Sequence, residues 1–97
     1  MVIVFDNDEL EAIYQGLKTK AKPKYPQEII NQFSKTVKLM SLADDIMQLK
    51  SIKGLNFEVL KADLKGKFSV RVNSKYRIIL RKELGKFIVE ELSNYYD

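Results

Sequence analysis

The sequence predicts an α+β fold, in which an N-terminal strand and two helices pack on one face of a small antiparallel β-sheet. Apolar residues recur at helical spacing in the first half of the chain and alternate with polar residues in the second half. The period changes at Gly54. With 97 residues, of which 45% are hydrophobic and 31% charged, the chain has a globular composition, and we expect residues 1–97 to form one domain.

The beginning of the chain is expected to form a strand and a first helix. Residues 2–5 are β-branched or aromatic and predict the strand. Asn7 or Asp8 is suited to cap the helix, and Glu11, three residues after Asp8, resembles part of a capping box. The helix is expected to end near Thr19. Its buried stripe is Leu10, Ile13, Tyr14 and Leu17.

A second helix is expected after a basic linker at residues 18–24. Pro26 is suited to the first helical position, where a missing N–H group costs nothing. Residues 43–49 either continue this helix or form a short third one. The predicted buried stripe of the second helix is Ile29, Ile30, Phe33, Val37 and Met40.

The second half is expected to form an antiparallel meander. Residues 67–73 and 75–81 alternate apolar and polar side chains around a turn at Asn73-Ser74. Gly85 marks the next turn, residues 87–92 a further strand, and residues 59–64 an additional strand before the others. The alternation produces a core face and a basic face. Arg71 and Arg77 lie on adjacent strands of the basic face, where their heads can converge on one anion.

Basic residues are concentrated in the second half of the chain. The formal net charge is +4 and the pI about 9.3. Residues 61–82 carry eight Lys and Arg, including all three arginines, against one acid, Asp63. Such a field attracts a polyanion such as nucleic acid, although a solvated face that keeps a small protein in solution would have the same charge.

The composition excludes several kinds of chemistry. The chain has neither cysteine nor histidine, so it cannot form a disulfide, a thiolate nucleophile or a Ser-His-Asp triad. The commonest transition-metal ligands are also missing, and we expect no metal site. No apolar run approaches the roughly 20 residues that span a bilayer. Because the N-terminus also lacks the pattern of a signal peptide, we expect a cytoplasmic protein that does not contact membranes.

From Leu55 to Tyr96 the sequence resembles the RelE superfamily of bacterial toxins, in particular its HigB-like branch. The resemblance rests on LKADLKG at 60–66, FSVRVN at 68–73, YRIILR at 76–81 and ELSNYY at 91–96. It implies a RelE-like fold and a toxin of a type II toxin–antitoxin system that cuts messenger RNA on the translating ribosome without a metal or other cofactor. The partners it implies are a cognate antitoxin, expected to be of the helix-turn-helix type, messenger RNA and the ribosome, with operator DNA bound only through the antitoxin complex.

The resemblance also implies roles for single residues. The ribose 2′-hydroxyl attacks the adjacent phosphate and the 5′-oxygen leaves. Arg71 and Arg77 match phosphate-binding arginines, although Arg77 could instead pair with Glu91. Lys61 matches an active-site lysine that orients the 2′-hydroxyl or acts as the base; otherwise it is a surface lysine. Five further cations are expected to contact RNA or ribosome backbone without specificity: Lys53, Lys65, Lys67, Lys75 and Arg81.

The C-terminus departs from the family pattern. HigB-like proteins commonly carry a histidine beside a tyrosine there, whereas this chain has Tyr95 and Tyr96. A tyrosine or Lys61 must then transfer the proton, unless catalysis depends mainly on charge stabilisation and positioning. The tyrosines could also stack on an RNA base, or their rings could simply pack against the protein. Glu58 is a further candidate base, unless it is a strand-end carboxylate paired with a nearby lysine. Without histidine, cleavage of free RNA is expected to be weak and cleavage of ribosome-bound messenger stronger.

Two other functions remain open from the sequence. A ParE-like poison of DNA gyrase has the same fold, because fold does not determine activity. A toxin that has lost its histidines could also retain nucleic-acid binding without cleavage. The combination of Lys61, Arg71, Arg77 and a C-terminal tyrosine favours the ribonuclease, since a gyrase poison has no need of such a cluster.

Overall fold

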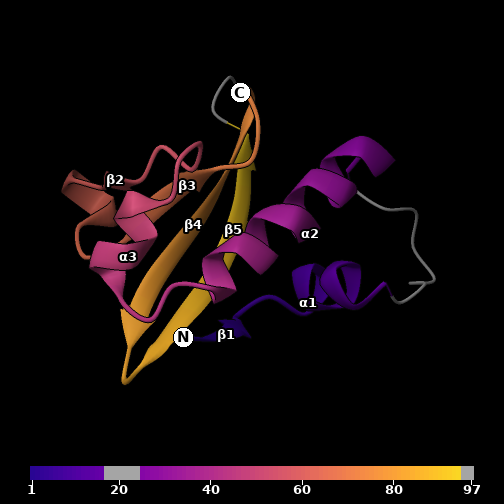
Figure 1. Cartoon of the computed structure of the whole chain (residues 1–97). Helices are drawn as coiled ribbons and strands as arrows, with labels where there is room; N and C mark the ends of the chain where they lie inside the picture. Colours follow the sequence, from indigo (N-terminus) through magenta and orange to yellow (C-terminus); the bar gives the residue numbers. More distant parts are fainter. Residues whose placement is uncertain (17–24, 95–97) are drawn as a thin grey trace.

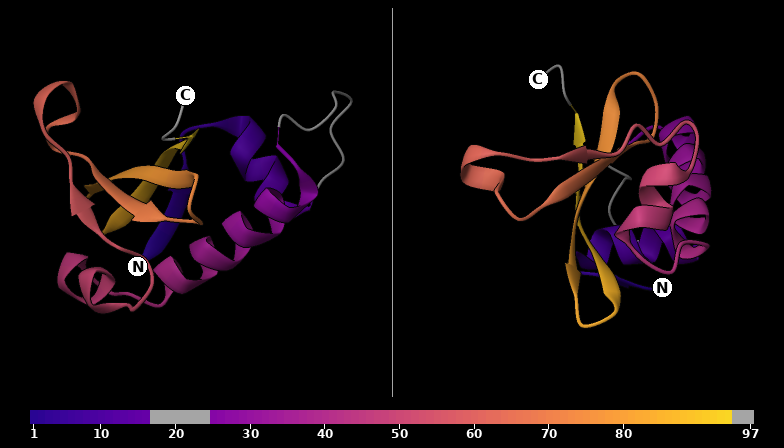
Figure 2. Two further views of the ribbon diagram at one scale, coloured as in Figure 1. Left: turned by 90° about the horizontal axis from the view of Figure 1, so that it is seen from above. Right: turned by 60° about the vertical axis from the view of Figure 1, so that its left-hand side comes forward.

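The computed structural model describes residues 1–16 and 25–94, which form three α-helices and one five-stranded sheet. The helices lie on one side of the sheet, as the right-hand view of Figure 2 shows. The predicted α+β architecture is therefore confirmed. In chain order (Figure 1), the elements are β1 (Val2–Phe5), α1 (Asp8–Gln15), α2 (Gln27–Ser41), α3 (Ile46–Ser51), β2 (Glu58–Val59), the 3₁₀ helix η1 (Ala62–Leu64), β3 (Phe68–Arg71), β4 (Tyr76–Glu83) and β5 (Lys86–Asn94).

The strand order is β1-β5-β4-β3-β2. Strands β2 to β5 pair antiparallel, as the meander predicted. Strand β1 instead pairs parallel with β5, with Val2 opposite Lys86 and Phe5 opposite Val89. The sheet is thus mixed rather than wholly antiparallel. A parallel neighbour needs a long connection, and here the helices and the other strands provide it.

Helix α1 is shorter than the sequence predicted. Its N-cap is Asn7 rather than Asp8, because Asn7 has an extended backbone and its side chain accepts a hydrogen bond from the Leu10 amide at 3.1 Å. The helix ends at Gln15, where Gly16 adopts a left-handed φ of 71° and its N–H donates to helix carbonyls. The predicted end at Thr19 lies outside the described residues, as does Leu17.

Helices α2 and α3 are separate. Pro26 precedes α2 as its N-cap and is not the first helical residue, although it does mark the helix start. Asp45 begins α3, because its carboxylate accepts a hydrogen bond from the Gln48 amide at 2.9 Å. Of the two predictions for residues 43–49, a continuation of the second helix or a short third helix, the third helix is therefore correct. No helix in residues 1–16 and 25–94 is long and apolar enough to cross a membrane.

The strand predicted at residues 59–64 is mostly absent. Only Glu58 and Val59 pair with β3. Ala62 then takes a left-handed φ of 56° and η1 begins, so the backbone leaves the sheet. The Leu60 amide donates to Lys67, and this bond closes the connection at its base.

The core lies between the helices and the sheet. Phe33 and Met40 of α2 are completely buried, so the apolar stripe of this helix belongs to the core, as its spacing predicted. Ile30 of the same stripe is only partly buried. The sheet contributes Val70, Ile78, Leu80, Phe87, Val89 and Leu92; the alternation along β5 is interrupted at residue 90, where the register shifts.

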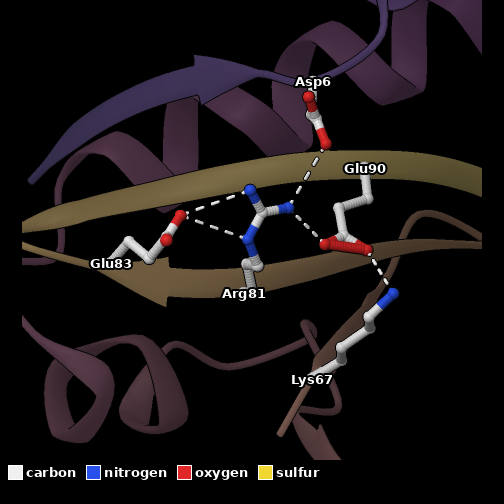
Figure 3. A network of polar contacts seen from close by, with 5 residues as sticks. All are labelled: Asp6, Lys67, Arg81, Glu83 and Glu90. Atoms are coloured by element: carbon white, nitrogen blue, oxygen red, sulfur yellow. Dashed lines mark hydrogen bonds and ion pairs between the residues drawn. The ribbon is translucent and has the colours of Figure 1, made fainter. Parts of the chain in front are cut away.

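A network of charged side chains connects β4 and β5 with the residues that follow β1 and precede β3 (Figure 3). Arg81 pairs with Glu90, with Glu83 at 3.2 Å and with Asp6 at 3.3 Å. Lys67 reaches the other oxygen of Glu90 at 2.6 Å. The register of β4 and β5 shifts between Ile79 and Leu80, where residue 90 has no partner of its own. This irregularity allows one carboxylate to bind both cations.

The Glu90 carboxylate should make the fold sensitive to acid. Burial alone would raise its pKa, but hydrogen bonds from Lys67 and Arg81 outweigh burial and lower the pKa. A lowered pKa in the folded state means that stability is present at neutral pH and is lost as the pH falls through the carboxyl range. We expect Glu90→Gln to reduce the free energy of unfolding at pH 7 by about 1–2 kcal/mol and to flatten the acid limb. Urea unfolding between pH 3 and 7 measures both changes. The control is Glu91→Gln, which makes the same substitution at an exposed residue. Equal losses of stability in the two variants would contradict a special role of Glu90.

The β4–β5 turn contains backbone strain that a substitution should relieve. Leu84 and Gly85 have φ of 43° and 79°, and the Leu84 side chain is 99% exposed. Such a turn favours Asn-Gly, whereas leucine is strained there. We expect Leu84→Asn to raise the free energy of unfolding by about 0.5–1 kcal/mol. Urea titration measures the change. Leu84→Ala removes the same exposed side chain without favouring the turn, so a similar gain from alanine would contradict the explanation.

Candidate functional site on the open sheet face

Two arginines project from the face of the sheet opposite the helices. Arg71 of β3 and Arg77 of β4 are directly paired in the antiparallel register. Directly opposed residues project from the same face, and their neighbours Val70 and Ile78 belong to the core on the other side. The predicted placement of the two arginines on one open face is therefore confirmed.

The Arg77 guanidinium is held by the segment that leads into β2. Its Nη1 donates to a Glu58 oxygen at 2.8 Å, and its Nη2 donates to the Asn56 carbonyl at 3.3 Å. The Arg77 side chain is 11% exposed, whereas that of Glu58 is 57% exposed. Among the described acids, its ion-pair partner is Glu58 rather than Glu91, so the alternative that paired it with Glu91 is wrong.

Backbone contacts bring Glu58 to Arg77. The Arg71 amide donates to the Leu55 carbonyl at 2.6 Å, which fixes this segment beside β3. Asn56 then adopts a left-handed φ of 42°, a conformation that asparagine tolerates better than most residues. Glu58 pairs with Ser69 in the sheet, so it lies on the same face as the two arginines. The acceptors of Arg77 are thus positioned by β3.

Arg71 is oriented by the turn that follows β3. Its Nε donates to the Asn73 carbonyl at 3.1 Å. The Asn73 side-chain oxygen accepts hydrogen bonds from the backbone amides of Lys75 and Tyr76, both at 2.8 Å. Its side-chain nitrogen donates to the Gln32 side-chain oxygen of α2 at 2.9 Å. The chain reverses at the predicted place, but over residues 72–75, between Arg71 of β3 and Tyr76 of β4, and not in the tight two-residue turn that was predicted at Asn73-Ser74. Within the described part of the chain, the Nη atoms of Arg71 donate no hydrogen bond, so they can bind an anion.

The electrostatics of this cluster suit an acid–base reaction on an anion. The hydrogen bond from Arg77 lowers the pKa of the Glu58 carboxyl and outweighs a small opposite effect of burial. Glu58 is therefore ionised at neutral pH and can accept a proton. Two guanidinium groups and one carboxylate can together bind a phosphate and take a proton from a group beside it.

The remaining predicted residues lie in different surroundings. Lys61 is exposed at the start of η1, in the connection that extends away from the helices (Figure 2). Lys53, Lys65 and Lys75 are also exposed, and no ion pair of the described residues involves any of these four lysines. Lys67 and Arg81 differ, because Glu90 partly neutralises both.

Tyr95 and Tyr96 lie outside the described residues. Strand β5 is described to Asn94, which pairs with Tyr76, the neighbour of Arg77. Asn94, the last described residue of β5, thus lies one register position beyond Ser93, which pairs with Arg77.

Glu58 contributes more to this face than its sequence context predicted. The alternation predicted a basic face, but Glu58 and Glu90 also lie on it, each bound to an arginine. Glu58 was expected to pair with a lysine if it was not a base, and its partner is Arg77 instead. One signal was available: Glu58 is the only acid between Asp45 and Asp63.

A separate hollow of about 470 Å³ lies at the end of β5. The Tyr25 hydroxyl donates to the Leu92 carbonyl at 3.3 Å, and its ring meets Tyr76 edge-on. Burial, followed by the charges of Glu9 and Glu91, raises the pKa of Tyr25. Two carboxylates make this hollow unsuitable for phosphate.

The chain matches a family model described as the RelE-like toxin of the type II toxin–antitoxin system HigB, over residues 3–96. Toxin HigB-1 of Vibrio cholerae serotype O1 is 31% identical to it over 81 residues, which cover 84% of this chain and 83% of that protein.

Solved structures share the fold at low sequence identity. A YoeB–YefM complex from Staphylococcus aureus matches with a TM-score of 0.64 and 20% identity, over 99% of this chain and 98% of that one. A YoeB/ParE toxin from Agrobacterium tumefaciens matches with a TM-score of 0.64 and 17% identity, over 99% and 100%. YafQ from Escherichia coli matches with a TM-score of 0.63 and 11% identity, over 97% and 92%.

Proposed function

Because this chain belongs to the HigB-like family of RelE-like toxins of type II toxin–antitoxin systems, we propose that it is an endoribonuclease that cleaves messenger RNA and thereby stops translation. The observation that carries this proposal is the pairing of Arg71 and Arg77 on an open sheet face, with the Glu58 carboxylate bound to Arg77. A phosphate and a neighbouring hydroxyl are the groups that this combination can act upon.

The arginines bind the scissile phosphate. Attack by the 2′-hydroxyl places extra negative charge on the phosphate oxygens, and guanidinium groups held in advance stabilise that charge. Arg77 is held by Glu58 and Asn56, whereas the Nη atoms of Arg71 donate to none of the described residues. We expect Arg71 to bind the phosphate first and Arg77 to exchange part of its bond with Glu58 for a bond to a phosphate oxygen.

Glu58 takes the proton from the 2′-hydroxyl. In the free protein the bond from Arg77 lowers the pKa of Glu58, which makes it a weak base. When phosphate takes over the Arg77 guanidinium, that lowering is reduced and the phosphate charge opposes ionisation of Glu58. Substrate binding would therefore turn Glu58 into a stronger base when it is needed. Lys61 remains the alternative base or a group that orients the hydroxyl.

The leaving 5′-oxygen needs a proton donor. A tyrosine is protonated at neutral pH, so Tyr95 or Tyr96 can supply this proton or stack on a base. Lys53, Lys65 and Lys75 are exposed cations that can contact the RNA or ribosome backbone. Lys67 and Arg81 contribute less in this proposal, because the carboxylate of Glu90 already binds them.

The ribosome is the expected setting for cleavage. The chain has no histidine, so positioning of the messenger must supply a larger share of the rate. A cognate antitoxin is the expected protein partner. The S. aureus structure with the same fold is a complex of YoeB with YefM, and we propose an equivalent antitoxin here, expected to be of the helix-turn-helix type and to provide any contact with operator DNA.

The test is transcriptome-wide mapping of RNA 5′ ends shortly after this chain alone is induced in bacterial cells. New ends inside translated frames, in phase with codons and absent with Arg77→Ala, are the expected result. Purified chain should then cut ribosome-bound messenger far faster than the same RNA free in solution. Growth arrest with DNA damage and no new ends would instead indicate a gyrase poison, and neither effect would indicate a toxin that only binds.

A further inference from the structure

Helix α2 carries an exposed apolar hollow on its outer side. The hollow has a volume of about 520 Å³ and is lined by Lys35, Lys38, Leu39, Ser41 and Leu42, which we call the α2 patch. Leu39 is 42% exposed and Leu42 is 73% exposed. Because α2 already buries a full apolar stripe against the sheet, these two leucines are additional to what the core requires.

The α2 patch has the spacing of a helix-docking surface. Lys35, Lys38, Leu39 and Leu42 fall at i, i+3, i+4 and i+7, so they share one side of the helix. Ser41 donates its hydroxyl to the Lys38 carbonyl at 2.6 Å and does not need a polar partner. The charges at the patch are therefore the two lysine ammonium groups, which form no ion pair with any described residue.

We propose that the α2 patch binds an acidic amphipathic helix of the cognate antitoxin; this inference rests on the proposed function. The partner helix would place apolar side chains on Leu39 and Leu42 and carboxylates beside Lys35 and Lys38. Charge complementarity selects this partner, because this chain has a net charge of +4 and no described acid pairs with Lys35 or Lys38.

Other occupants fit the α2 patch less well. RNA would use the lysines but gain little from two leucines, and the patch contains no aromatic ring on which a base could stack. A second copy of this chain would bring the same two lysines into the contact. An acidic segment with apolar side chains satisfies both the leucines and the lysines.

The position of the α2 patch makes it an anchor. Helix α2 covers one face of the sheet (Figure 2), and the strand register places Arg71 and Arg77 on the other face. A helix bound to the α2 patch would hold the antitoxin on the toxin without touching the arginines. Contacts that block the arginines must then come from another part of the antitoxin.

The test measures binding of the antitoxin produced from the gene adjacent to that of this chain. Isothermal titration calorimetry compares Leu42→Ser and the Lys35→Glu/Lys38→Glu double variant with two controls, Leu84→Ser and Lys50→Glu. All are made in the Arg77→Ala chain, which we expect to be non-toxic. Both patch variants are expected to weaken binding at least tenfold, and the controls by less than twofold. Thermal unfolding confirms that each variant is folded. Patch variants that bind as tightly as the controls would overturn the proposal.

A second measurement separates this proposal from the proposed function. In the otherwise wild-type chain, patch variants should still arrest growth, but co-expressed antitoxin should rescue growth less well. If the wild-type chain does not arrest growth, the proposed function is wrong, but the calorimetry still shows whether the α2 patch binds the antitoxin. A free chain that dimerises, with Leu42→Ser abolishing the dimer and leaving antitoxin affinity unchanged, would assign the patch to a second copy and overturn our proposal.

Discussion

Arg77→Ala is expected to lower RNA cleavage by about 10²–10³-fold, because it removes a preorganised donor from the phosphate that gains charge in the transition state. The side chain is 11% exposed, and its guanidinium is held by Glu58 and Asn56, so it needs to exchange only part of its bond with Glu58 before it binds the phosphate. Single-turnover cleavage of messenger on purified ribosomes measures the loss. We expect the loss to affect the rate of the chemical step more than the affinity for RNA.

Two further variants make the Arg77 result specific. Lys86→Ala removes one positive charge from an exposed residue of β5 and should change cleavage by less than about threefold. Arg77→Lys keeps the charge but loses the planar fork, so an intermediate rate is expected. Full activity of a correctly folded Arg77→Ala protein would show that the phosphate does not bind at this position.

Glu58→Gln is expected to reduce the chemical step by about 10²-fold, because glutamine keeps the shape of the side chain but cannot take a proton. The amide oxygen can still accept the hydrogen bond from Arg77, so the position of the guanidinium is preserved. Loss of activity in this variant would therefore report on proton transfer. The matched control is Asp63→Asn, which makes the same chemical change at an exposed acid of η1.

The pH dependence of the wild-type chain should report the same group. Arg77 lowers the pKa of Glu58 in the free protein, so the acid limb of kcat/KM is expected below the ordinary glutamate value of about 4.3. The acid limb of kcat should lie at higher pH, since bound phosphate takes over Arg77. Glu58→Gln should remove both limbs. If Glu58→Gln cleaves within threefold of wild type and keeps the limbs, Glu58 only positions Arg77 and another group is the base.

Much of the fold could be predicted because its signals are local. The alternation through Val70, Ile78 and Leu80 assigned two strands and their buried face, and the stripe through Phe33 and Met40 assigned α2. Caps, by contrast, depend on the conformation of single residues. Gly16 ends α1 because its backbone turns left-handed, which composition alone does not reveal.

Strand pairing was less predictable, because it depends on residues far apart in the chain. Val2 and Lys86 come from opposite ends of the chain, yet they are register partners on the adjacent parallel strands β1 and β5. The predicted strand at 59–64 failed for a related reason. Its residues have suitable side chains, but η1 takes the backbone away after two residues of pairing.

The sequence by itself determined that this protein is a basic α+β toxin of the HigB-like family, with Arg71 and Arg77 on one face and with no histidine or cysteine to do its chemistry. Only the tertiary structure decided that Glu58 binds Arg77, that Glu90 binds Lys67 and Arg81, and that Leu39 and Leu42 remain outside the core. The physical reason is that side-chain period is a local property of the chain, whereas an ion pair between residues 19 positions apart depends on register, bulges and loop closure.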